Sequence, residues 1–121
     1  MASFSKRIAF AVRRELVLAR QCHHANQHAE AFSHLENAHV LGQRATYWHT
    51  RVHIEMLKWA VQNRSFRESR GQIMRIVGAF TKTALGWVPN GNTGGADVSP
   101  FAPMPLRDDH ARKIQAALKS K

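Results

Sequence analysis

Apolar residues recur every three to four positions over most of the chain, which is the spacing of amphipathic α-helices. This spacing predicts four helices, over residues 4–25, 28–42, 46–63 and 65–83. The connections between them are short, so we expect neighbouring helices to run antiparallel in an all-α fold. In the fourth helix the pattern predicts that Glu68 faces outward. It predicts that the inward-facing residues are Phe66, Ile73, Ile76, Val77 and Phe80.

Two packings of four antiparallel helices fit this pattern. One is a compact bundle. The other is a pair of degenerate tetratricopeptide-like units, because small and apolar residues recur at a period of about 34 residues. We favour the bundle, since a tetratricopeptide array usually needs three or more repeats to be stable.

The composition changes after the predicted helices, which places the four-helix domain at residues 1–85. Residues 86–106 are rich in Gly, Pro and Asn and cannot be helical. The same segment carries apolar residues such as Trp87 and Phe101, so we predict an extended strap that is ordered against the bundle. Residues 107–121 predict a short, basic and frayed helix.

Local signals predict where the helices begin and end. Gly42 is suited to the end of the second helix. The last helix should cover about residues 109–119, with Ile114 and Leu118 on one side. Side chains that can cap a helix N-terminus precede the later helices, at Thr46, at Ser65 and at Asp108 or Asp109.

Several residues in the predicted helices are able to bind a metal ion. Glu15 falls in the middle of the apolar face of the first helix, where an isolated charge is very costly. Glu36 and His39 are three positions apart on the second helix, and His49 and His53 are four apart on the third. Each pair therefore shares one helix face, and the pairs can converge between adjacent helices.

The predicted metal site comprises Glu15, Glu36, His39, His49 and His53. Imidazole and carboxylate donors suit Zn(II) or another divalent transition metal. Cys22 and His23, near the end of the first helix, are weaker candidates for metal ligands. A metal-free alternative is a buried polar network in which Glu15 accepts hydrogen bonds from His39 or His53.

The sequence offers no positive case for an enzyme. The pair His49 and His53 lacks the glutamate of a helical metalloprotease, because Thr50 follows His49. A di-iron bundle needs a second Glu-x-x-His motif, which this chain does not contain. The GNTGG segment lacks the Gly-Lys-Ser/Thr ending of a phosphate loop, so we do not expect nucleotide binding.

Charge and cysteine content narrow the partners and the compartment. The 121 residues carry a formal net charge of +10 at pH 7, which favours an acidic protein partner. The 18 Lys and Arg residues are spread without a long run of like charges, which argues against nucleic acid as the main partner, although the net charge leaves that alternative open. The single cysteine and the lack of an apolar stretch of about 20 residues predict a cytoplasmic protein with no membrane contact. For the oligomeric state we expect a monomer or a homodimer.

Four segments carry a resemblance to a known family: AFSHLENAHVLGQ (31–43), HTRVHIEMLK (49–58), RGQIMRIVGA (70–79) and GWVPNGNTGGADVSPFAPMP (86–105). Over residues 10–106 the chain resembles a small bacterial domain family of unknown function. The resemblance implies a small helical cytoplasmic protein and an association with heavy-metal-responsive genes. No catalytic activity can be carried over from this resemblance.

The sequence thus predicts a transition-metal-binding or metal-handling accessory protein with a His/Glu pocket between the first three helices. The alternative is a tetratricopeptide-like interaction module whose basic surface receives an acidic partner.

Overall fold

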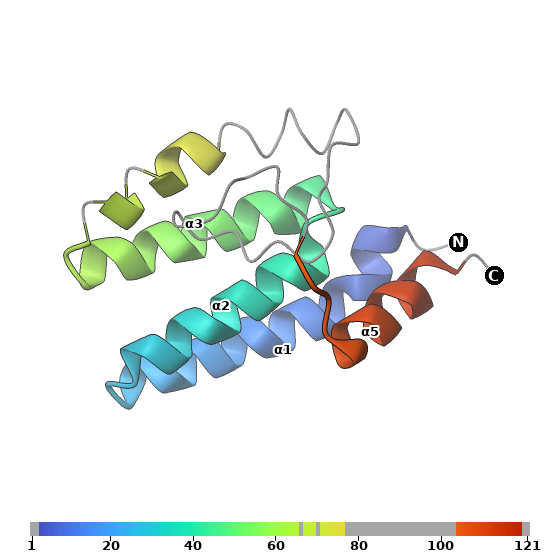
Figure 1. Cartoon of the computed structure of the whole chain (residues 1–121), viewed down its shortest axis with the longest axis horizontal. Coiled ribbons are helices and arrows are strands. Elements are labelled where there is room, and N and C mark those ends of the chain that lie inside the picture. Colours follow the sequence, from blue (N-terminus) through green and yellow to red (C-terminus); the bar gives the residue numbers. More distant parts are fainter. Residues whose placement is uncertain (1–2, 66, 70, 77–103, 120–121) are drawn as a thin grey trace.

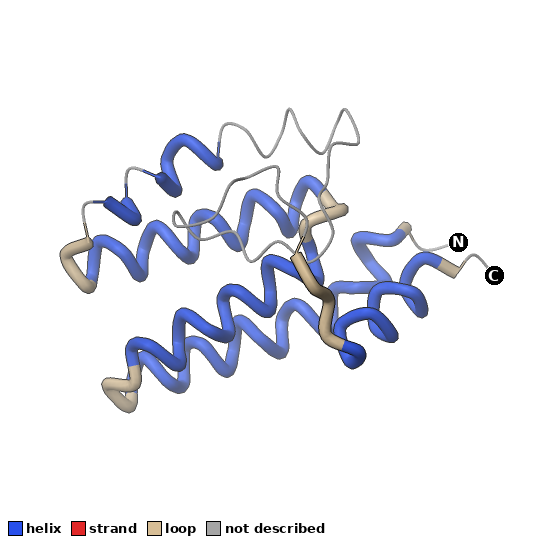
Figure 2. The backbone as a smooth tube through the Cα atoms, in the orientation of Figure 1, coloured by secondary structure: helices blue, strands red, loops and turns tan. Residues whose placement is uncertain are grey.

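The computed structural model describes residues 3–65, 67–69, 71–76 and 104–119, most of which are helical (Figure 1). Its helices are α1 (Phe4–His24), α2 (His28–Gly42), α3 (Thr46–Gln62) and α5 (Asp108–Leu118). Residues 67–69 and 71–76, which follow α3, are also helical. No strand occurs in the described residues, so the predicted all-α class is confirmed (Figure 2).

The helices pack as neighbours in chain order. α1 and α2 lie side by side and antiparallel, and α3 packs against α2 (Figure 1). α5 packs on α1 and α2, where the Arg7 Nε of α1 donates a hydrogen bond to the carbonyl oxygen of Ala117. The start of α1 and the end of α5 therefore meet. Within the described residues no helix combines the length and the apolar character that crossing a bilayer requires.

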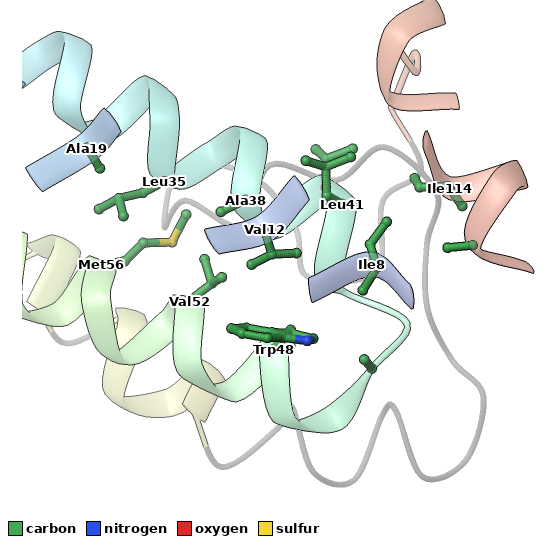
Figure 3. Packing of buried hydrophobic residues seen from close by; sticks show 13 residues of the cluster. Ile8, Val12, Ala19, Leu35, Ala38, Leu41, Trp48, Val52, Met56 and Ile114 are labelled. Carbon is green, nitrogen blue, oxygen red and sulfur yellow. The ribbon is translucent and has the colours of Figure 1, made fainter. Parts of the chain in front are cut away.

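An apolar cluster joins all four of these helices (Figure 3). Trp48 of α3 is 2% exposed, and its indole Nε1 donates a hydrogen bond of 2.9 Å to the Ser5 carbonyl oxygen of α1. Each methylene buried in such a cluster stabilises the fold by about 0.8 kcal/mol. Its other buried members include Ile8, Val12, Leu35, Ala38, Leu41, Val52, Met56 and Ile114.

The turn between α2 and α3 is fixed by close packing. Gly42 ends α2 as predicted, and a Cβ added there would lie only 2.8 Å from the Trp48 Cβ. The glycine is therefore needed for contact between the helices, whereas the prediction rested on its backbone freedom. Ala45 precedes α3 and no side chain caps that helix, so Thr46 does not serve as the predicted cap.

The helical residues after α3 bury a different face from the predicted one. Ser65 caps them as predicted, because the Glu68 backbone N–H donates to its Oγ at 3.3 Å. Gln72 is fully buried, whereas Ile73, predicted to face inward, is 56% exposed. Glu68, predicted to face outward, is half-buried and accepts a hydrogen bond from Gln72. Three more residues that were predicted to face inward lie outside the described residues: Phe66, Val77 and Phe80.

The predicted strap, residues 86–106, falls almost entirely outside the described residues and stays a prediction. α5 is found one residue from the predicted range 109–119, with Arg107 at its N-cap position in place of an aspartate. We expected this helix to fray, but Ile114 and Ala117 are 7% and 4% exposed against α1 and α2. Packing on the other helices holds α5 in place.

Candidate metal centre

Three histidines from two helices face one another. His39 lies near the end of α2, and His49 and His53 lie on successive turns at the start of α3. The ring centroids are 4.9 Å apart for His39 and His49, 4.8 Å for His39 and His53, and 4.9 Å for His49 and His53. The three rings therefore form a nearly equilateral triangle, and a possible ligand nitrogen of each lies within 4.8 Å of the others.

These rings are shielded from solvent. His39 and His49 are 3% exposed and His53 is 1% exposed. Histidine is seldom buried so completely without a partner for its ring nitrogens, because an unsatisfied buried polar group costs about 1–3 kcal/mol. Three such rings in contact bring their ring nitrogens together at one buried point of the structure.

The triangle has dimensions suited to one metal ion. Zinc binds a histidine nitrogen at about 2.0–2.1 Å and so lies roughly 3.2 Å from the ring centroid. Two rings bound at the tetrahedral angle then have centroids about 5.2 Å apart and nitrogens about 3.4 Å apart. The observed centroid distances are slightly shorter than that. The rings need only to turn, moving their nitrogens by roughly an ångström, to bind one ion.

A hydrogen-bonded chain sets the proton position on His53. Gln72 Nε2 donates to Glu68 Oε2 at 2.5 Å, and Gln72 Oε1 lies 2.5 Å from His53 Nδ1. Because a carboxylate only accepts, the Gln72 amide must point its NH₂ group at Glu68 and its oxygen at His53. His53 Nδ1 must then donate, and the neutral ring carries its lone pair on Nε2. Such outer partners orient the histidine ligands of metal sites.

Glu15 is not brought to these histidines. Its carboxylate is 5% exposed and accepts hydrogen bonds from His34 Nδ1 at 2.8 Å and Asn37 Nδ2 at 3.0 Å. Burial raises the pKa of the Glu15 carboxyl, but the bonds from His34 and Asn37 lower it more, so the pKa lies below its ordinary value. His34, expected to face away from the core, is thus the partner of Glu15.

The remaining predicted ligands are not members of the group formed by the three histidines. Glu36 is half-buried on α2 and does not belong to the described group of mutually close donors. Cys22 carries a free thiol in the last turns of α1. The His23 ring contacts His24 and His28 near the turn between α1 and α2. The described group of mutually close donors therefore contains three of the predicted ligands and none of the other four.

Gln72 and Glu68 are the functional residues that sequence reasoning missed. They are four positions apart, the spacing that puts two side chains on one helix face. A glutamine and a glutamate at this spacing were a usable signal for a polar face turned toward α3. The apolar residues Ile73 and Ile76 outweighed that signal in the prediction.

A groove of about 320 Å³ opens between α1, α2 and α3. Arg51 and Lys58 on its rim each lie 3.5 Å from Glu55, whereas Arg20 pairs with no acidic side chain that the structure describes. The rim is therefore net basic. The floor is apolar, with Leu16, Ala19, Ala31, Leu35 and Trp59.

A family model described as a protein of unknown function, DUF3703, matches residues 6–114. The chain belongs to this family. No curated protein and no solved structure matches the chain. The DUF3703 description names no activity.

Proposed function

We propose that this DUF3703 protein binds a divalent transition metal ion through His39, His49 and His53 and serves as a small metal-handling protein. The observation that carries the proposal is the convergence of three buried imidazoles within 4.8 Å. The resemblance to a family associated with heavy-metal-responsive genes supports the same role. Three protein ligands leave a fourth position for water or a transfer partner.

The donor set favours particular ions. Imidazole suits Zn(II), Cu(II), Ni(II) and Co(II) better than Mg(II) or Ca(II), which prefer oxygen. Ring centroids 4.8–4.9 Å apart correspond to angles of roughly 97–100° at a shared ion, about 10° below the tetrahedral angle that zinc adopts. Zn(II) is therefore the ion that we expect, with Co(II) as its spectroscopic substitute.

A buried polar network without metal is the rival explanation for the same residues. The hydrogen bond from His53 to Gln72 is compatible with both explanations, a metal site and a buried polar network. Glu15, the acceptor expected in such a network, bonds to His34 and Asn37 instead. The mutual contact of the three rings is the observation that favours a shared ion.

Competition with a chromophoric chelator tests the proposal. The wild-type protein should take one Zn(II) tightly, and the double variant H49A/H53A should lose that ion. The exposed His24→Ala variant is the matched control and should keep it. Failure of the wild-type protein to bind zinc, or unchanged affinity in a folded H49A/H53A variant, contradicts the proposal.

The groove between α1, α2 and α3 supports a second candidate function, the docking of an acidic protein segment. Its apolar floor and net basic rim complement a peptide that carries both carboxylates and apolar side chains. We expect binding of a Glu-rich peptide to weaken at least tenfold in Arg20→Glu and to fall with salt. Unchanged peptide binding in that variant removes the candidate. The oligomeric state and the cytoplasmic location remain predictions.

A further inference from the structure

The turn between α1 and α2 brings two further histidines together. His23 lies in the last turn of α1, and His28 begins α2. Asn26 takes a positive φ of 60° and lets the chain reverse, and the Gln27 N–H donates to the Cys22 carbonyl oxygen at 2.8 Å. The His23 and His28 rings then lie with centroids 5.3 Å apart and planes at 60°.

The Nδ1 atoms of these two rings are buried and lack hydrogen-bond partners. Neither atom bonds to any residue that the structure describes. Each such atom costs about 1–3 kcal/mol, and native proteins keep few of them. Two neighbouring imidazoles with this unmet requirement indicate a shared ligand that accepts both lone pairs.

The spacing is compatible with a metal ion bound in a bent arrangement. Two imidazoles on one ion have centroids about 5.2 Å apart at the tetrahedral angle and about 6.4 Å apart when linear. The observed 5.3 Å matches the bent case. His24 is exposed and its ring is 6.0 Å from that of His23, so it lies outside the pair.

The surroundings limit the strength of this site. His23 also lines the groove, whose rim carries Arg20, Arg51 and Lys58 against Glu55. Net positive charge nearby opposes a cation. Two protein ligands in an open groove therefore bind more weakly, and exchange faster, than three buried ones.

We propose that His23 and His28 form a second, weaker and solvent-exchanging site for Zn(II) or a similar divalent transition metal. Its ligands do not overlap with His39, His49 and His53. The two sites can therefore be tested separately, and failure of one leaves the other standing.

Zinc titration of four folded proteins tests the second site: wild type, H23A/H28A, H49A/H53A and the variant with all four substitutions. We expect two ions in the wild type, one in each double variant and none in the quadruple variant. The ion kept by H49A/H53A should be the weaker one. Two ions kept by H23A/H28A, or the weaker ion lost in His24→Ala, overturns the assignment.

A second readout uses the folded wild-type protein, so it does not depend on buried substitutions. Histidine ring ¹⁵N signals report which nitrogen binds metal. The Nδ1 signals of His23 and His28 should shift with the second equivalent of zinc, after those of the buried histidines. Nδ1 signals that stay unchanged at saturating zinc contradict the proposal.

Discussion

Replacing Gln72 with leucine separates a metal site from simple core packing. Gln72 is fully buried and links His53 to Glu68 through two hydrogen bonds of 2.5 Å. Leucine has a similar volume, so it keeps the packing but removes the acceptor that holds the His53 Nδ1 proton. The substitution therefore removes the constraint that Gln72 places on the His53 ring and on its tautomer.

The size of this effect follows from the lost partner. Losing an outer partner of a metal-bound histidine weakens affinity about 10–100-fold, which is roughly 1.4–2.7 kcal/mol. Leaving the buried N–H unsatisfied also lowers the free energy of unfolding of the metal-free protein by about 1–3 kcal/mol.

Chelator competition measures the zinc affinity of Gln72→Leu, and thermal unfolding without metal measures its stability. Gln115→Leu on the exposed face of α5 is the matched control and should leave the affinity unchanged. A folded Gln72→Leu protein with wild-type zinc affinity refutes the role given to this hydrogen-bonded chain.

Three further predictions concern the fold around the site. Gly42→Ala should destabilise the protein by about 1–2 kcal/mol in denaturant titration, because a Cβ 2.8 Å from the Trp48 Cβ outweighs the gain in helix propensity. A variant at least as stable as wild type contradicts that packing. Glu15→Ala should lower the free energy of unfolding by about 1–3 kcal/mol, since His34 loses its buried acceptor, yet leave zinc affinity unchanged. Weaker zinc binding would make Glu15 a ligand after all. Stability should fall with acid in two stages. Burial lowers the pKa of His110 in the folded protein. Below about pH 6.5 the His110 side chain therefore takes up a proton more readily in the unfolded chain than in the folded protein, and the free energy of unfolding falls. The lowered pKa of Glu15 adds a further loss of stability below about pH 4.3. This loss is complete once the pH lies below the pKa of Glu15 in the folded protein. His110→Gln should make the upper stage smaller and leave the lower stage unchanged, and an unchanged profile contradicts the assignment.

The helices were predictable because their signal is local. Apolar residues such as Val12, Val52 and Met56 recur at the helical period, and all three are fully buried. The pairing of His49 with His53 follows from the same period. The identity of the neighbouring element does not follow from it, because a helical pattern shows which face is buried and not what covers it.

Glu15 illustrates that limit. Its position in an apolar stripe correctly indicated a buried carboxylate with partners. Those partners are His34 and Asn37 on α2, while α5 packs on both helices. Contacts of this kind depend on how the helices pack against one another. The spacing of residues within one helix does not show this packing.

Gln72 illustrates a different limit. A shift of one residue rotates the buried face of a helix by about 100°, so burying Gln72 exposes Ile73. Hydrophobicity alone predicts the opposite choice. The amide is buried because it joins His53 to Glu68, and that requirement appears only when the two helices are placed together.

X-ray absorption at the zinc edge tests the central claim most directly. The H23A/H28A protein, loaded with one equivalent of zinc, isolates the buried site. We predict three imidazole nitrogens at about 2.0–2.1 Å and one further light ligand. A spectrum with fewer than two imidazoles, or with sulfur in the first shell, would contradict zinc binding by His39, His49 and His53.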